Sequence, residues 1–210
     1  MATNKKLLVE GKDDCRTIPH LMGHHVHWPD DKKLAPVEIL DCEGGGNVWS
    51  RLSLHIKSNI LTHIGVVVDA DGDGITKWNG FRNSCLPQFP SIPESLPEKG
   101  LILNENGMHL GFWMMPNNVE DGMLETFLSY LVSTEHMDPW RFSETSSANA
   151  RSNGATYKDS HMDKAKIHTF LAWIDPPGTT FGIALKKKVL DPNSENATPF
   201  VEWFRKLFEL

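Results

Sequence analysis

Short apolar runs and helical apolar stripes alternate along the first 90 residues. The runs at residues 6–10, 37–41 and 63–69 are rich in β-branched and aliphatic side chains and predict strands. Between and after them, apolar residues at helical spacing predict helices from about residue 13, over 48–56 and over 76–86. Such alternation of strand and helix favours an α/β fold with a mostly parallel sheet wrapped by helices.

The remaining 120 residues follow a different pattern. A proline-rich connector over residues 87–100 precedes two strand-like runs that flank Asn106-Gly107, a hairpin signal. Helices are predicted over residues 121–132, with Asp121 as N-cap, over 160–174, and over 198–210, with Thr198 as N-cap and Pro199 at the first helical position. Beyond Pro139 the pattern is helical but less regular. We therefore expect a core over residues 1–135 and a helical C-terminal extension, residues 136–210, packed on it.

Composition narrows the class of protein. No apolar stretch reaches 18 residues, and the N-terminus turns acidic after three apolar residues, so we expect neither a membrane span nor a signal peptide. Three widely spaced cysteines, Cys15, Cys42 and Cys85, form no disulfide framework and suit a reduced, cytoplasmic protein. The net charge is −6, yet residues 151–190 carry seven basic and three acidic side chains. That segment is either a polyanion-binding surface or an ordinary solvated helix face.

Acidic side chains stand where the predicted strands end. Glu10 ends the first strand, while Asp69 and Asp71 follow the third. Carboxyl ends of parallel strands share one edge of a sheet, so these carboxylates should lie close together. Grouped carboxylates are costly unless protons or cations neutralise them, and oxygen ligands suit Mg²⁺ or Mn²⁺. Asp73 is equally well explained as a turn or helix-capping residue, and Asp41 and Glu43 after the second strand are less distinctive.

Four other features are weaker candidates for function. The stretch "EGGGN", residues 43–47, could hold a phosphate at a helix N-terminus but is more typical of a plain turn. Four histidines between His20 and His27 have no matching ligand partner, and the tryptophans are more typical of a core than of base-stacking platforms. The stretch "DADGDG" also begins like a calcium loop, but Gly80 occupies the position of the required glutamate.

The motifs resemble those of known families. "LLVEGKDD", followed about 55 residues later by "GVVVDADGDG", resembles a Toprim domain, which has a glutamate-glycine after strand one and a DxD after strand three. "GMLETFL" and "DKAKIHTFLAW" are similar to DUF3226, a family related to the Toprim half of OLD (overcoming lysogenization defect) nucleases. The resemblance spans most of the chain. It implies a Toprim-like, Rossmann-like α/β fold whose central sheet is mostly parallel.

The resemblance also implies roles for particular residues. Glu10 matches the Toprim glutamate, and a downstream lysine, for which we choose Lys164 before Lys166, would act near the scissile phosphate. Gly11, Asp73 and Lys166 would stand in an outer shell. The implied ligands of Mg²⁺ or Mn²⁺ are Glu10, Asp14, Asp69, Asp71 and Glu125.

These residues favour a divalent-metal-dependent nuclease that hydrolyses phosphodiesters by a two-metal mechanism. A non-catalytic Toprim module that binds metal and a phosphate-bearing ligand within a larger complex is the alternative, and a primase-like or nucleotide-hydrolysing enzyme would share the same site. The expected partners are nucleic acid, DNA before RNA, and a second copy of the chain. Since the chain has no Walker A motif, an ATPase or other protein would be a separate partner, by analogy in phage defence.

Overall fold

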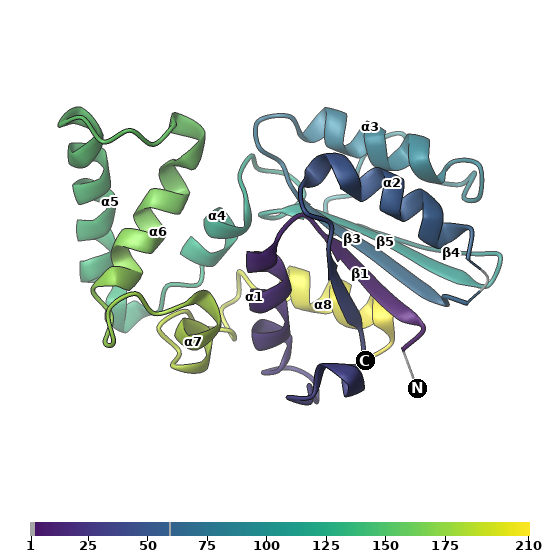
Figure 1. Cartoon of the computed structure of the whole chain (residues 1–210), viewed down its shortest axis with the longest axis horizontal. Helices are drawn as coiled ribbons and strands as arrows, with labels where there is room; N and C mark the ends of the chain where they lie inside the picture. Colours follow the sequence, from purple (N-terminus) through teal and green to yellow (C-terminus); the bar gives the residue numbers. More distant parts are fainter. Residues whose placement is uncertain (1–2, 59) are drawn as a thin grey trace.

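The computed structural model describes residues 3–58 and 60–210, and its centre is a five-stranded sheet (Figure 1). The strands are β1 (Lys5–Val9), β2 (Glu38–Asp41), β3 (His63–Asp69), β4 (Leu101–Glu105) and β5 (Met108–Met115). Their order is β2-β1-β3-β5-β4, with β4 antiparallel to β5 and all other neighbours parallel. The predicted mostly parallel α/β class is therefore confirmed. The predicted hairpin also forms, because Asn106 and Gly107 both adopt the positive φ that a tight hairpin turn requires.

Helices cover both faces of the sheet. The helices are α1 (Lys12–Met22), α2 (Gly45–Ile56), α3 (Gly74–Cys85), α4 (Leu124–Ser129), α5 (Met137–Ser152), α6 (Met162–Ala172), α7 (Phe181–Lys186) and α8 (Thr198–Phe208). Short 3-10 turns occupy Lys32–Leu34, Thr134–His136 and Asp159–His161. Figure 1 shows α2 and α3 on one face and α1 and α8 on the other, with α5, α6 and α7 grouped beyond α4.

Alternate side chains of each central strand enter two separate cores. Leu8 and Val66 belong to the cluster under α2 and α3, whereas Leu7 and Val67 belong to the cluster that includes α1 and α8. Since side chains of a strand alternate between faces, continuous apolar runs of this kind are expected of strands buried on both sides. The two cores hold the carboxyl ends of β1 and β3 in place.

The last helix, α8, packs against the sheet at a pair of glycines. Gly65 of β3 and Gly111 of β5 are direct neighbours in register, and Leu207 of α8 lies against both. A Cβ atom at Gly65 would stand 2.8 Å from Leu207 Cδ2, so glycine at this pair lets α8 approach the strands closely. The Trp203 side chain adds a buried hydrogen bond from its Nε1 to the Leu101 carbonyl, 2.9 Å long.

Two predicted helix starts are wrong. α4 begins at Leu124, and Thr126 Oγ1 accepts from the backbone N–H of Met123 at 3.0 Å, so Asp121 is not the N-cap. Instead Asp121 accepts a hydrogen bond from the Gly72 N–H in the acidic turn. α8 begins with Thr198 inside the helix, because Ala197 already has helical angles and takes the N-cap position. Along the described part of the chain, no helix has the length and apolar character needed to cross a membrane.

Candidate metal centre

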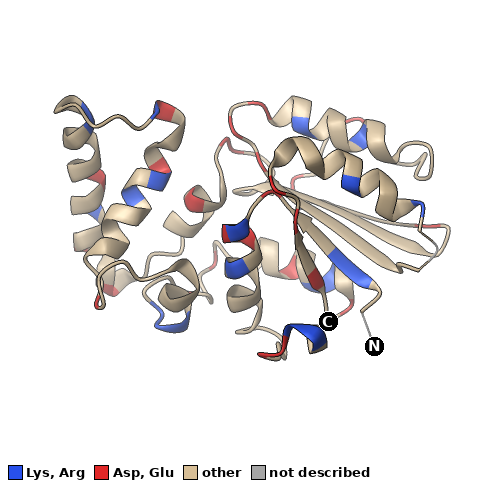
Figure 2. Cartoon of the chain, viewed as in Figure 1, with Lys and Arg blue, Asp and Glu red and all other residues tan. Residues whose placement is uncertain are grey.

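The ends of β1 and β3 bring three of the predicted ligands together. Val9 pairs with Val67 in register, so Glu10 and Asp69 leave neighbouring strands at the same edge. One carboxylate oxygen from each of Glu10, Asp69 and Asp71 lies within 4.8 Å of the other two. Acidic positions gather where these strands end (Figure 2). The edge of the sheet thus presents a compact set of oxygen donors.

The acidic turn after β3 is held by hydrogen bonds to a segment that follows β5. The backbone N–H groups of Ala70 and Asp71 both donate to the Gly122 carbonyl, at 2.9 and 3.2 Å. Asp71 has a left-handed backbone, φ 51°, which aspartate adopts more readily than most residues. The Asp73 side chain accepts a hydrogen bond from the Thr76 N–H at 3.3 Å, which caps α3. Its structural role is therefore a helix cap.

Two further predicted residues are buried beside this group. Asp14 of α1 is 8% exposed and accepts from the Gly11 N–H at 3.2 Å, so Gly11 acts through its backbone. Glu125 of α4 is 3% exposed. Burial raises the pKa of Asp14 to about 7; the Gly11 hydrogen bond opposes this shift, and the charges of Glu125 and Glu10 add to it.

Asp69 is the most strongly perturbed carboxyl of the centre. Burial raises its pKa to about 8, and the charges of Asp14, Glu10, Asp71 and Glu125 add to the rise. Its Oδ1 accepts from the Leu124 N–H at 2.9 Å, which joins the end of β3 to the start of α4. The other four predicted carboxylates therefore all act on Asp69 electrostatically.

A lysine from α6 reaches the same region. Lys164 Nζ lies 2.9 Å from Glu125 Oε1. Burial alone would lower the pKa of Lys164, but the hydrogen bond and charge of Glu125 outweigh it and raise that pKa. Lys166, the second choice, instead pairs with Asp163 at 3.0 Å. Of the two lysines, Lys164 is the one that contacts a predicted ligand.

Lys77 was not predicted and lies directly in the acidic group. It stands in the first turn of α3, and its Nζ is 2.7 Å from Glu10 Oε1 and 3.8 Å from Asp71 Oδ2. The sequence signal was a lysine one helical turn after the capping Asp73, which places it beside the strand ends. Lys77 supplies a positive charge to carboxylates that otherwise repel one another.

The glycine stretch after β2 makes room for Glu10. The Gly44 N–H donates to the Glu10 carbonyl at 2.8 Å. A Cβ atom at Gly45 would stand only 2.8 Å from Glu10 Oε2, whereas one at Gly46 would meet nothing within 4 Å. Asp41 accepts from the Glu43 N–H within the turn itself, at 2.7 Å. The stretch therefore positions a carboxylate in this structure.

The donor set fits a hard divalent cation. Every group is a carboxylate oxygen, the ligand type that suits Mg²⁺ and Mn²⁺. Burial disfavours the ionised form of Asp14 and Asp69, so a cation that replaces their protons would relieve the shift. Glu10, Asp69 and Asp71 could hold one ion, and Asp14 and Glu125 stand beside them.

A comparison with known protein families identifies the family of this chain. The model of the family described as "Protein of unknown function (DUF3226)" matches residues 4–209. The chain belongs to the DUF3226 family. No curated protein and no solved structure matches it. The predicted DUF3226 membership is thus confirmed over nearly the whole length, and it assigns no activity.

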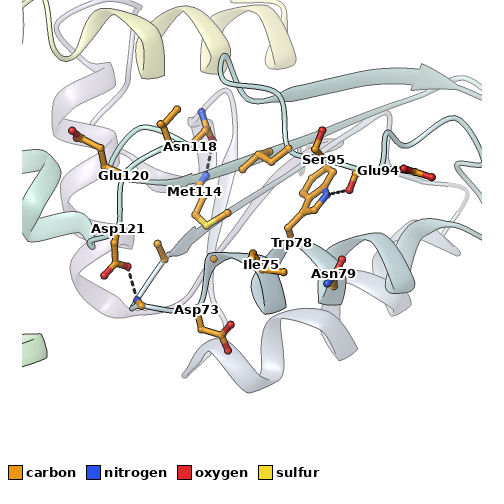
Figure 3. A pocket seen from close by; sticks show the side chains of 15 residues that line it. Asp73, Ile75, Trp78, Asn79, Glu94, Ser95, Met114, Asn118, Glu120 and Asp121 are labelled. Carbon is orange, nitrogen blue, oxygen red and sulfur yellow. Dashed lines mark hydrogen bonds between the residues drawn. The ribbon is translucent and has the colours of Figure 1, made fainter.

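A cavity opens beside the acidic turn of this DUF3226 protein (Figure 3). It has a volume of about 590 Å³ and shares the loop from Ala70 to Gly74 with the metal centre. Trp78 forms part of its wall and donates from Nε1 to the Glu94 carbonyl at 2.9 Å. Acidic side chains such as Glu120 and Asp121 also line it. The acidic side chains of this lining would repel a phosphate.

Proposed function

We propose that this chain is a divalent-metal-dependent nuclease of the Toprim type, which hydrolyses phosphodiester bonds in nucleic acid, with DNA the first substrate to test. The observation that carries the proposal is the grouping of Glu10, Asp69 and Asp71 at the carboxyl edge of the sheet. The order and spacing of these residues resemble the Toprim pattern. Cations held by these carboxylates would supply Lewis acidity and neutralise phosphoryl charge.

The chain's own residues have separate tasks in this proposal. Lys164 forms an ion pair with Glu125 of the acidic group. Its positive charge can stabilise the charge of a phosphoryl oxygen there. Lys77 balances Glu10 when no divalent ion is bound. Exposed lysines of this segment such as Lys186 and Lys188 would contact the nucleic-acid backbone, and a separate ATPase or other protein could deliver the substrate.

Cleavage of supercoiled plasmid and of single-stranded DNA and RNA tests the proposal, with Mg²⁺, Mn²⁺ or EDTA present. We expect metal-dependent cleavage that Asp69→Asn abolishes. Lys164→Met should lower the turnover rate about 100-fold. Lys166→Met is the matched control, because Lys166 pairs with Asp163 and not with a ligand. Cleavage that survives Asp69→Asn would indicate a contaminating nuclease and refute the assignment.

A second candidate function is a non-catalytic module that binds metal and a phosphate-bearing ligand. The Lys77–Glu10 ion pair favours it over the nuclease, because Lys77 competes with a divalent ion for Glu10, and hydrolysis by a two-metal mechanism would need that carboxylate as a ligand. Titration calorimetry with Mn²⁺ separates the candidates when combined with the cleavage assay. Mn²⁺ uptake that Glu10→Gln weakens, together with no cleavage of any substrate, would support the binding module over the nuclease.

A further inference from the structure

A second group of metal-ligating side chains lies at the opposite, amino edge of the sheet. His63 begins β3, and His109, near the start of β5, is its direct neighbour in register. Glu209 follows the last residue of α8 and approaches both rings. One ligand atom from each of His63, His109 and Glu209 lies within 4.8 Å of the other two. This group shares no residue with the acidic centre.

We propose that His63, His109 and Glu209 bind a transition-metal cation of the Zn²⁺ class. Two imidazoles and one carboxylate are a ligand set that suits Zn²⁺, in contrast to the all-oxygen set at the other edge. Ligands of tetrahedral zinc lie about 3.3–3.5 Å apart, given bonds of about 2.0–2.2 Å. His63 Nε2 is 3.3 Å from Glu209 Oε2, and His109 Nε2 is 3.8 Å from Glu209 Oε1. The group needs little movement to close on an ion.

The buried ring of His63 gives the strongest support for a metal site. Its side chain is 6% exposed, and its Nε2 faces Glu209 Oε2 at 3.3 Å without forming a hydrogen bond of good geometry among the described residues. Its Nδ1 lies 2.8 Å from Thr62 Oγ1, and that hydroxyl can donate onward to the Asn4 carbonyl at 3.4 Å. When the Thr62 hydroxyl donates to Asn4, the His63 Nδ1–H donates to Thr62, and Nε2 keeps the lone pair that a metal ion requires. Metal-binding histidines are oriented by such a bond from the other ring nitrogen.

The surroundings of the group support a neutral imidazole and a fixed carboxylate. Burial lowers the pKa of His63, and the charges of His109 and Lys5 lower it further, whereas Glu209 opposes the shift. The two rings stack with centroids 4.3 Å apart, an arrangement that two protonated imidazoles would disfavour. Lys5 Nζ donates to the Phe208 carbonyl and so holds the end of α8 at this edge, next to Glu209.

One contact must give way when the ion enters. The Asn104 amide nitrogen lies 3.0 Å from His109 Nε2, and Asn104 faces His109 across the β4–β5 pair. Asn104 is exposed, so water can replace this contact. A bound ion would join the end of α8 to β3 and β5, and its fourth position would be open to water.

Zinc binding by the full chain in the presence of excess Mg²⁺ tests the proposal, because the excess Mg²⁺ would compete with Zn²⁺ for the all-oxygen acidic centre. Competition with a chromophoric chelator should show one equivalent of Zn²⁺ bound at pH 7.5. Glu209→Gln and His109→Ala should each weaken binding by more than about 100-fold, since changes in outer-shell residues alone cost 10–100-fold. Glu202→Gln, at another exposed glutamate of α8, is the matched control and should bind like the wild type.

Thermal unfolding gives a readout that is independent of the chelator. Zn²⁺ at about 100 times its dissociation constant should raise the Tm of the wild type by about 5 °C and leave that of Glu209→Gln unchanged. Glu209 is 60% exposed, so this variant should fold. Absence of stoichiometric Zn²⁺, or equal binding by wild type, Glu209→Gln and His109→Ala, would overturn the proposal. Neither outcome depends on nuclease activity.

Discussion

Replacing Asp69 by asparagine should stabilise the metal-free protein, relative to the wild type, more at pH 7.5 than at pH 5. Burial, with the neighbouring carboxylates, raises the pKa of Asp69 from 3.8 to about 8. The folded state therefore keeps a proton that the unfolded state loses. Asp69 contributes full stability below pH 3.8, and that contribution is lost as the pH rises toward 8. The asparagine can still accept the Leu124 N–H bond that Asp69 accepts.

The size of the effect follows from linkage. Each pH unit between the two pKa values changes the free energy of unfolding by about 1.4 kcal/mol. From pH 5 to pH 7.5 the wild type should lose about 3 kcal/mol relative to Asp69→Asn. Urea unfolding of both proteins in EDTA at the two pH values measures this difference.

A control variant and a measurement with Mg²⁺ show whether the stability difference comes from the buried charge of Asp69. Asp73→Asn should change stability little at either pH, because asparagine caps a helix about as well as aspartate. Adding Mg²⁺ at pH 7.5 should stabilise the wild type and not Asp69→Asn. A stability difference between wild type and Asp69→Asn that is the same at pH 5 and pH 7.5 would refute the reasoning.

Three more substitutions test particular contacts. Gly45→Ala should weaken Mn²⁺ binding in calorimetry, because its Cβ would displace the Glu10 carboxylate, whereas Gly46→Ala should bind normally; equal affinities would contradict this. Lys77→Gln should tighten Mn²⁺ binding about 3–10-fold by removing a competing charge, and weaker binding would show instead that Lys77 helps hold the site. Gly111→Ala should cost about 1–3 kcal/mol in urea unfolding through overlap with Leu207, and an unchanged midpoint would mean that α8 can move aside.

The sheet was predictable because its strands are buried on both faces. Continuous apolar runs such as residues 64–68 are hard to explain otherwise, and the alternating helices imply parallel neighbours. The sequence pattern did not predict α5 clearly, and the reason is physical. Its buried face consists of Trp140, Ser143 and Ser147, so small polar residues replace the apolar stripe on which periodicity depends. Ser147 meets Thr169 of α6 by a 3.4 Å hydrogen bond between hydroxyls.

The candidate metal centre was only partly predictable from local pattern. Glu10 and Asp69 end strands that pair directly, so the parallel topology itself brings them together. The Lys164–Glu125 contact depends on how α6 docks against α4, and its residues are 39 positions apart. Spacing along the chain does not encode such docking, and Lys164 was chosen only through the family resemblance. Lys77 lies close in sequence to the end of β3, but its ion pair with Glu10 depends on how α3 is placed and could not be predicted from the sequence.

Charge balance at the acidic edge indicates what a divalent ion would have to replace if it bound there. Five carboxylates (Glu10, Asp14, Asp69, Asp71 and Glu125) face two lysines, so full ionisation would leave a formal charge of −3 in a partly buried space. The raised pKa values of Asp14 and Asp69 show that protons offset part of this charge near neutral pH. A divalent ion that enters must displace those protons and draw Glu10 from Lys77. Metal affinity at this edge should therefore be set by competition with protons and with Lys77, in addition to the number of oxygen ligands.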